Sequence, residues 1–379
     1  MFCLIMEAMG ITGQFIAIAL CATTLFAGEL SHSKNVQGFS YRHDEIAEGP
    51  WSIHIVKMDR SNTNLEVQTT LPPGRRFGLA RLSAQVKGLN VGKEHVVAAI
   101  NGDYYENHQP YVGDPQGLQI MRGELISAPF DWTCFWIDPR GQPNMGIVEA
   151  KFQATLPCGA LVNFGLNEAR ENDEAVIYTS AVGSKTKARG GVELILEPWS
   201  AGPQLPLRAG EKYFAKVVEI NKSGNSATTP DRLVLSLGPK LLKEIPPPAI
   251  GDMIRISTAT SPSLKNVQTA IGGGPAILRA GKRVFPKQAH VRHPRSVVGW
   301  NRQSIFLVEV DGRQRNLSVG MTFEELADYL MKIGCDNAMS LDGGGSSTLW
   351  ALGQVMNNPC EGAERGAANG LAIVAKEMR

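Results

Sequence analysis

Hydrophobic and polar residues alternate along two segments near the N-terminus, residues 51–58 and 65–70. Alternation with a period of two is typical of β-strands that bury one face. Three other short segments are largely apolar, as in strands buried on both faces. They are residues 96–100, 305–310 and 338–341. The pattern therefore predicts a chain in which strands supply most of the core.

The middle of the chain, residues 150–265, has a different character. Short strand patterns such as 192–196 and 213–220 are separated there by proline and glycine clusters, which is typical of a β-rich unit. We interpret this stretch as an insertion into a larger domain at residues 93–379. Residues 29–92 are expected to form an N-terminal β-rich segment.

A helical pattern is clearest at residues 322–333. Thr322 and Glu325 have the spacing of a capping box, apolar residues follow at helical intervals, and Gly334 is placed to end the helix. A second, short helix is expected at residues 79–87. The predicted fold class is α+β: a mixed, mainly β core with a few flanking helices and an inserted β-rich subdomain.

Length and composition limit the classes of protein. The chain has 379 residues, more than the roughly 250–300 residues that one hydrophobic core usually holds. It is 43% hydrophobic and 20% charged, with a formal net charge of +2. Because nucleic-acid-binding domains are strongly basic, this balance argues against a nucleic-acid partner. The sequence does not indicate an oligomeric state.

The first 28 residues resemble a secretory signal peptide. Residues 11–27 are apolar, and Glu7 is the one charged residue in the segment. The absence of Lys and Arg before the apolar stretch departs from the usual pattern, so a membrane anchor or a buried helix are the alternatives. No later run reaches the ~18 apolar residues of a spanning helix. We therefore expect a secreted or periplasmic protein.

Four of the six cysteines lie beyond this leader: Cys134, Cys158, Cys335 and Cys360. An even number in an exported protein permits two disulfides, with three possible pairings. Cys335 with Cys360 is the favoured pair, because it would tie down the glycine-rich segment between them. Cys134 with Cys158 is then the second pair. The cysteines and histidines lack the spacing of a zinc site.

Three of the predicted strands end in an aspartate next to a glycine. The aspartates are Asp103, Asp311 and Asp342. Asp-Gly is also a common turn sequence, but ligands often bind where neighbouring strands end at one edge of a sheet. We therefore expect the three carboxylates to gather at one edge, where repulsion between them would raise at least one pKa.

Two glycine triplets accompany these aspartates. Backbone amides in such segments can approach an anion or a sugar closely, although the first triplet fits strand packing equally well. Asn101 and Ser346 are plausible hydrogen-bonding partners beside them. The triplets consist of Gly272, Gly273, Gly274, Gly343, Gly344 and Gly345.

Seven short motifs occur in order between residues 95 and 375. They are Asn101-Gly102-Asp103-Tyr104, Ile271-Gly272-Gly273-Gly274-Pro275, His293-Pro294-Arg295, Asp311-Gly312-Arg313, Gly320-Met321-Thr322, Leu341-Asp342-Gly343-Gly344-Gly345-Ser346-Ser347 and Glu364-Arg365. As an ordered set they resemble the phosphodiester glycosidase family. The resemblance implies hydrolysis of an α-linked sugar joined through phosphate to a second group, which releases the free sugar and a phosphomonoester.

The residue types in these motifs suit that chemistry. Glycoside hydrolysis usually uses carboxylates, so the three aspartates are predicted to be catalytic, without individual roles. A phosphate leaving group needs neutralisation of its charge, and guanidinium groups match phosphate geometry. Arg295 and Arg313 are therefore predicted to assist catalysis, and Arg365 to bind substrate. His293 and Glu364 are further substrate-binding candidates, with a structural histidine and a partner that only orients Arg365 as the alternatives.

Two other functions fit parts of the same pattern. In a metal-dependent phosphodiesterase the aspartates would hold divalent cations and water would attack phosphorus. A non-catalytic module that binds anionic glycans would need the glycines and arginines but not every carboxylate. The glycosidase interpretation requires no cofactor, and it leaves room for a single Ca²⁺ or Mg²⁺ bound by oxygen atoms.

Overall fold

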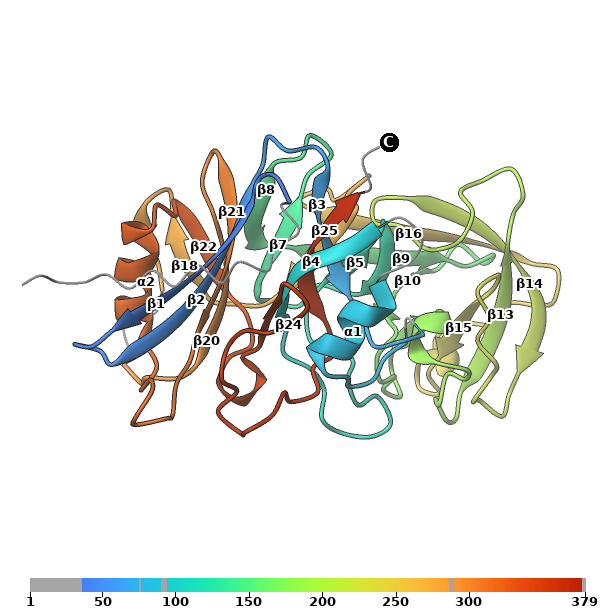
Figure 1. Cartoon of the computed structure of the whole chain (residues 1–379). Coiled ribbons are helices and arrows are strands. Elements are labelled where there is room, and N and C mark those ends of the chain that lie inside the picture. Colours follow the sequence, from blue (N-terminus) through green and yellow to red (C-terminus); the bar gives the residue numbers. More distant parts are fainter. Residues whose placement is uncertain (1–35, 75, 90–93, 286–289, 377–379) are drawn as a thin grey trace, which may run out of the picture. The chain divides into compact units, whose positions relative to one another are not determined.

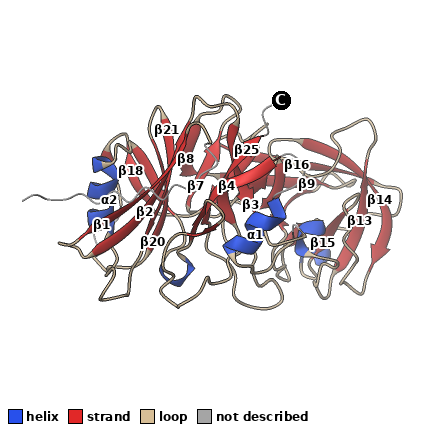
Figure 2. Ribbon diagram, viewed as in Figure 1, coloured by secondary structure: helices blue, strands red, loops and turns tan. Residues whose placement is uncertain are grey.

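The computed structural model describes residues 36–74, 76–89, 94–285 and 290–376. The predicted leader, residues 1–28, lies outside the described residues, so its prediction stays untested. The described residues form four β-sheets and two α-helices (Figures 1 and 2). The predicted α+β class with a mainly β core is therefore confirmed.

A seven-stranded antiparallel sheet joins the N-terminal strands to the C-terminal part of the chain. Its strands lie in the spatial order β1 (Phe39–Ile46), β2 (Trp51–Asp59), β21 (Ser304–Val310), β20 (Arg295–Trp300), β22 (Asn337–Ser340), β18 (Ala276–Arg279) and β19 (Lys282–Arg283). The central pairing of β2 with β21 places Ile53 opposite Val310 and His54 opposite Glu309. Residues separated by about 250 positions are thus direct neighbours.

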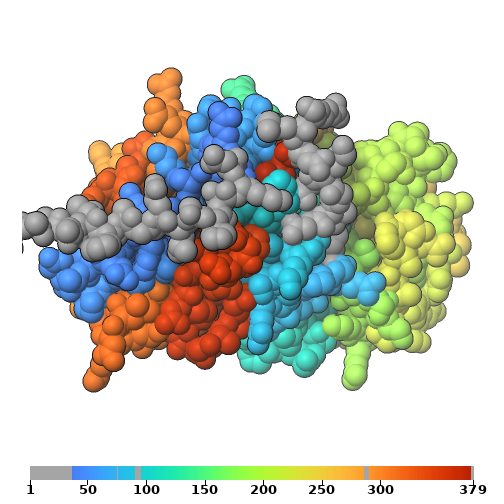
Figure 3. All heavy atoms as spheres, viewed as in Figure 1, coloured from blue at the N-terminus to red at the C-terminus, as the bar shows by residue number. Residues whose placement is uncertain are grey.

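A five-stranded sheet also joins distant segments. Its order is β24 (Gln354–Val355), β23 (Leu349–Ala351), β4 (Glu94–Asn101), β25 (Gly370–Lys376) and β3 (Leu65–Thr70). On the face shown in Figure 3, C-terminal residues (red) lie beside N-terminal residues (blue and cyan), in agreement with the pairing of β25 with both β3 and β4.

The other two sheets come from the middle of the chain. A second five-stranded sheet has the order β6 (Glu124–Ser127), β5 (Gln119–Met121), β17 (Thr269–Gly272), β7 (Thr133–Ile137) and β8 (Pro143–Ile147). The eight-stranded sheet has the order β10 (Leu161–Asn163), β9 (Glu149–Thr155), β16 (Met253–Ser261), β14 (Lys212–Asn221), β13 (Val192–Pro198), β15 (Leu233–Leu237), β12 (Ala175–Tyr178) and β11 (Gly165–Leu166). All strands of this last sheet fall within residues 149–261.

The helices begin and end for local reasons. Helix α2 (Phe323–Lys332) has the predicted capping box: the Thr322 side chain accepts from the Glu325 amide, and the Glu325 side chain accepts from the Thr322 amide. Helix α1 (Leu82–Leu89) begins three residues later than predicted, because Ala80 forms a β-bridge with Ala367. Three short 3₁₀ helices complete the set: η1 (Ser180–Val182), η2 (Leu241–Lys243) and η3 (Gly344–Ser346).

One hydrophobic core lies between the seven-stranded sheet and the sheet that contains β4. Val56 and Leu307 come from the former, and Ile100 and Ile373 from the latter. All four are almost completely buried. Burial of apolar surface contributes roughly 25 cal/mol per Å², so this core holds together the strands whose ends carry the site. No helix in the described part of the chain is long and apolar enough to cross a membrane.

The predicted disulfides are not formed: within the described residues Cys134, Cys158, Cys335 and Cys360 are free thiols. Cys335 is buried in the core beneath α2, whereas the Cys360 Sγ lies 3.7 Å from the carbonyl oxygen of Gly344. Cys134 is buried in β7, and Cys158 is exposed. The four sulfur atoms therefore lie in different environments, and none is bonded to another.

Candidate active site

Asp103 and Asp342 are brought together from two different sheets by Asn101. The Asn101 side chain donates to the carbonyl oxygen of Asp342 (2.7 Å). Its Oδ1 accepts from the Ser296 hydroxyl (2.6 Å) and from the Thr348 amide (3.0 Å). Since both ends of this buried amide are occupied, Asn101 fastens the ends of β4 and β22 to each other.

The Asp103 carboxylate is buried. One oxygen accepts from the Tyr104 amide (2.8 Å) and the other from the Gly117 amide (2.7 Å). Gly272 packs directly against this carboxylate, where a Cβ would lie 2.2 Å from Oδ2. Burial raises the pKa of Asp103 to about 7, and the negative charge of Asp342 adds to the rise although the two amides oppose it.

Asp342 is only partly buried and is therefore the more accessible carboxylate of the pair. Burial raises its pKa to about 6, while Ser346, the positive charge of Arg365 and the Gly343 amide oppose the rise. The Ser346 hydroxyl is buried and has no hydrogen bond in good geometry to another described residue. A polar group in this state is available to a ligand.

Tyr104 lies within electrostatic reach of both carboxylates. Burial raises its pKa to about 12, Asp342 and Asp103 raise it further, and Arg295 lowers it. Its ring meets Trp132 edge to face at a centroid distance of 5.1 Å. Trp132 also borders a pocket of about 610 Å³, together with the exposed ring of Phe130. An aromatic surface thus leads away from the carboxylates.

Arg295 is a buried cation within electrostatic reach of Tyr104. Its guanidinium donates to the carbonyl oxygens of Met321 (2.9 Å) and Val291 (2.8 Å) and lies 4.0 Å above the centre of the Phe323 ring. Burial and the nearby Arg313 lower its pKa to about 10. No carboxylate of the described residues lies within 4 Å of it, so its positive charge remains uncompensated at short range.

Arg313 lies against the first turn of η3. Gly344 there has φ +63°, and a Cβ at this position would be 2.9 Å from the Arg313 Nη2. Glycine therefore permits both the backbone conformation and the close approach of the guanidinium. The Arg313 Nη2 also lies 3.2 Å from the His293 Nδ1. Burial, Arg295 and Arg313 lower the pKa of His293, which favours a neutral ring that accepts this hydrogen bond.

Arg365 is the third guanidinium at this loop. It packs against Gly345, and it forms an ion pair with Glu361. Glu364 accepts a hydrogen bond from the Ser83 amide (2.9 Å) at the start of α1, and its predicted contact with substrate stays a prediction. The carboxylate that orients Arg365 is therefore Glu361.

The remaining predicted glycines serve mainly in close packing. Gly343 packs on the carbonyl oxygen of Pro294, and Gly273 packs on that of Ser340. Gly274 has φ +129° and donates its amide to Ser340 (2.8 Å). The predicted substrate contacts of these glycines stay predictions.

Asp311 follows its strand at the same edge of the seven-stranded sheet as Asp342, because β21 and β22 both pair antiparallel with β20, which lies between them. The Asp311 Oδ2 accepts from the Ser52 hydroxyl (2.8 Å) and lies 3.2 Å from the His54 Nε2. Burial raises the pKa of the neighbouring Glu309, and the charge of Asp311 adds to the rise. The expectation of one shared sheet edge is therefore wrong for Asp103, because β4 belongs to a different sheet from β21 and β22. The predicted catalytic role of Asp311 stays a prediction.

His54 and Glu309 were missed by the sequence analysis. A signal was present in the Glu-Val-Asp sequence at residues 309–311, because residues two apart on a strand share one face. What the sequence did not provide was the pairing of β2 with β21, which places His54 opposite Glu309.

Comparisons with known proteins agree with this fold. A hypothetical protein from Synechocystis superposes with a TM-score of 0.69 at 19% identity, over 89% of this chain and 62% of that one. A putative exported protein from Burkholderia pseudomallei superposes with a TM-score of 0.66 at 20% identity, over 86% and 74% of the two chains. At these identities the likeness concerns the fold.

A shorter sequence match links the chain to the SPbeta prophage-derived uncharacterized protein YomE of Bacillus subtilis, with 36% identity over 85 residues. The match covers 22% of this chain and 13% of YomE. The chain therefore spans only a small part of that relative.

A family model matches the C-terminal part of the chain, residues 217–374. Six of the seven motifs lie inside this range, and the motif at Asn101 precedes it. The family is described as phosphodiester glycosidase. The resemblance that the motifs indicated is therefore confirmed: residues 217–374 match the phosphodiester glycosidase family.

Proposed function

We propose that this protein is a glycosidase that removes an α-linked sugar from a sugar-1-phosphodiester. The observation that carries the proposal is the meeting of two carboxylates of raised pKa, Asp103 and Asp342, with the guanidinium groups around Tyr104 and the η3 loop. The family match supports the same class of reaction. The arrangement offers a carboxylate for the sugar and positive charge for the phosphate.

Asp342 is the residue assigned to the reacting carbon, because it is the more accessible carboxylate and its pKa of about 6 leaves it ionised at neutral pH. It attacks the anomeric carbon or takes a proton from the attacking water. Asp103 accepts two backbone amides and is fully buried. Its role is to hold the turn at Tyr104 through the hydrogen bond from the Tyr104 amide.

The guanidiniums are assigned to the leaving group. A phosphomonoester is already a stable anion, so its departure needs little protonation but benefits from neutralisation of its charge. Arg295 and Arg313 lack a carboxylate within 4 Å among the described residues, and Arg365 adds to the charge near Asp342. Trp132 and Phe130 provide exposed aromatic faces of the kind that stack on sugars.

The bond that breaks can be identified by hydrolysis in ¹⁸O-labelled water. Cleavage between the anomeric carbon and oxygen places the label in the sugar and leaves the released phosphomonoester unlabelled. Mass spectrometry of both products, with sugar-1-phosphodiesters and nitrophenyl glycosides tested in parallel, provides the measurement. Label in the phosphate would contradict the proposal and would identify a phosphodiesterase instead.

We further propose that the protein is exported, on the basis of the apolar segment at residues 11–27. The N-terminal sequence of the mature protein, isolated from separated cell fractions, tests this. An intact N-terminus on protein recovered only from the cytoplasm would contradict it.

A further inference from the structure

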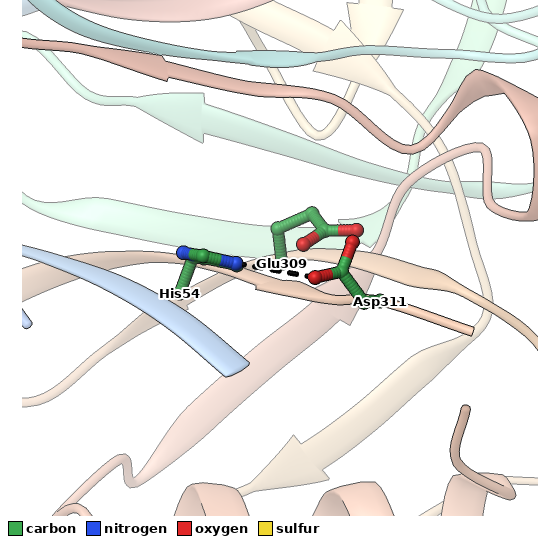
Figure 4. A group of neighbouring side chains, drawn as sticks. All are labelled: His54, Glu309 and Asp311. Atoms are coloured by element: carbon green, nitrogen blue, oxygen red, sulfur yellow. Dashed lines mark hydrogen bonds and ion pairs between the residues drawn. The ribbon is translucent and has the colours of Figure 1, made fainter. Parts of the chain in front are cut away.

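Three side chains outside the proposed active site form a compact group, which we name the buried triad: His54, Glu309 and Asp311. His54 lies on β2, directly opposite Glu309 on β21, and Asp311 follows two residues later on the same face. Figure 4 shows the imidazole and both carboxyl groups directed toward one another. One ligand atom from each residue can be chosen so that all three lie within 4.8 Å of one another.

The buried triad is sealed from solvent. The exposed fractions of His54, Glu309 and Asp311 are 4%, 0% and 1%. The His54 Nδ1 lies 2.8 Å from the Tyr41 hydroxyl. A hydrogen bond at one ring nitrogen fixes the orientation of the ring and leaves the other nitrogen for a second partner. That other nitrogen, Nε2, faces the Asp311 Oδ2 at 3.2 Å.

Glu309 is the least satisfied member of the buried triad. Neither of its carboxyl oxygens forms a hydrogen bond in good geometry with another described residue. The side-chain amide of Asn357 lowers the pKa of Glu309 as a hydrogen-bond donor outside good geometry, and the same amide group also donates to the carbonyl oxygen of Ser347 (3.2 Å). Burying an unpaired carboxylate is strongly unfavourable unless an ion pair or a metal compensates its charge.

From this geometry we propose that the buried triad binds one divalent transition-metal ion. An ion with two positive charges would neutralise both carboxylates and provide Glu309 with its missing partner. Imidazole nitrogen combined with carboxylate oxygen suits Zn²⁺ or Mn²⁺ better than Ca²⁺ or Mg²⁺, which prefer oxygen ligands alone. The ligands would be the His54 Nε2 and one oxygen each from Glu309 and Asp311.

The position of the buried triad indicates a structural role. The Asp311 Oδ1 accepts from the Asn358 amide (2.9 Å), which belongs to the segment that follows η3. Through Gly312, Asp311 is also connected to Arg313, whose guanidinium lies against Gly344. An ion at the buried triad would therefore stabilise the loop that carries Asp342 and its cations, without contact with the substrate.

The first test uses the unmodified protein and does not depend on activity. The full chain is depleted with a chelator, dialysed against Zn²⁺, Mn²⁺, Ca²⁺ or Mg²⁺ separately, and analysed for bound metal. We expect about one Zn²⁺ or Mn²⁺ per chain and a higher unfolding temperature in its presence, with neither effect from Ca²⁺ or Mg²⁺. Pulsed electron paramagnetic resonance of the Mn²⁺ form should show a coordinated histidine nitrogen.

The second test assigns the ion to these residues. Glu309→Gln and His54→Asn should each weaken binding by roughly tenfold or more. The matched control is Glu193→Gln, because Glu193 is equally buried in a strand but its carboxylate already accepts from Thr186 and Ser226. This control should leave metal binding unchanged.

Three outcomes would overturn the proposal: no bound transition metal in the unmodified protein, metal that stays bound in both triad variants, or an Mn²⁺ signal without a histidine nitrogen. Stabilisation by Glu309→Gln in the complete absence of metal binding would show that the buried triad is held by a shared proton instead. If the triad variants fail to fold, the stoichiometry and the nitrogen signal of the unmodified protein still decide the question.

Discussion

Two pairs of carboxylates lie at the ends of strands in this protein, and their surroundings differ. Asp342 of the first pair is partly exposed and lies near guanidinium groups, a tyrosine and the Ser346 hydroxyl. Glu309 and Asp311 of the second pair are sealed between β2, β21 and the segment after η3. In each pair burial raises the pKa of one carboxylate, and the charge of the other adds to the rise.

The difference shows that a raised pKa alone does not identify an active site. Like charges in a poorly solvated environment produce the same shift in both places. Two features distinguish the first pair. A ligand can reach Asp342, and the guanidinium of the nearby Arg295 has no carboxylate of the described residues within 4 Å. The second pair has a buried histidine beside it and is sealed from solvent, which suits an ion better than a sugar.

Asp342→Asn should have the largest effect, because it removes the accessible carboxylate of the first pair. We expect turnover of a sugar phosphodiester to fall by roughly a factor of 10³, within the range for loss of a general acid or base, while the unfolding temperature changes little. The control is Asp173→Asn, at a side chain that is 67% exposed. Full turnover in the Asp342 variant would contradict the assignment of Asp342 to the reacting carbon.

Arg313→Ala tests whether the cations act on the phosphate. Loss of a charged hydrogen-bond donor costs about 1.5–3 kcal/mol, so kcat/KM for the phosphodiester should fall roughly ten- to hundredfold. A neutral nitrophenyl glycoside should be affected far less. Arg283→Ala, at an exposed arginine paired with carboxylates of α2, is the control. Equal losses on both substrates would contradict the assignment of Arg313 to phosphate.

Gly344→Ala tests the close approach of Arg313 to the η3 loop. Gly353 provides a matched comparison: it also has positive φ, +95°, but nothing lies within 4 Å of a Cβ placed there. Both variants should lose about 1 kcal/mol of stability from backbone strain. Only Gly344→Ala should also raise KM for the phosphodiester, because only there does the new methyl group displace a guanidinium. Identical kinetics in the two variants would argue against this arrangement.

The smallest effects are expected from pH. Activity should fall as the pH drops through about 6, where Asp342 becomes protonated. The pKa values of Asp103 and Asp342 are raised on folding from 3.8, so their contribution to stability is complete below that value. It is lost as the pH rises through about 6 and 7.

Chemical denaturation at several pH values between 4 and 8 measures this loss, and it should be smaller in Asp342→Asn. A pH dependence of stability that is identical in the variant and in the unmodified protein would show that Asp342 is not buried enough to be perturbed.

Local features of the fold could be predicted from the sequence. The capping box at Thr322 and Glu325, the strand at residues 65–70 and the buried strand before Asp103 depend on neighbouring residues, and the structure has them as expected. The start of α1 was misplaced because the bridge from Ala80 to Ala367 spans almost the whole chain. Pairings at such separations are decided by packing that no short window contains.

For the candidate site, too, local motifs were predictable from the sequence and long-range contacts were not. Asp103, Asp342 and the three arginines were found through local motifs, and the structure brings their surroundings together. The position of Asp311 depends on β21 pairing with β2, and the role of Glu364 depends on α1 packing beside residues 364–367. The predicted disulfide between Cys335 and Cys360 failed for a similar reason, because spacing along the chain does not show on which side of a sheet each sulfur lies.

The contact of Asn101 with residues 342 and 348 has a consequence for biosynthesis. Asn101 leaves the ribosome more than 200 residues before its partners. Until those partners are synthesised, strand β4 lacks its neighbours β23 and β25, and the Asn101 side chain lacks its hydrogen bonds to residues 342 and 348. Contacts of such long sequence separation form late in folding. Catalytic competence should consequently arise in a single step after the last strand, β25, has been synthesised and inserted between β3 and β4.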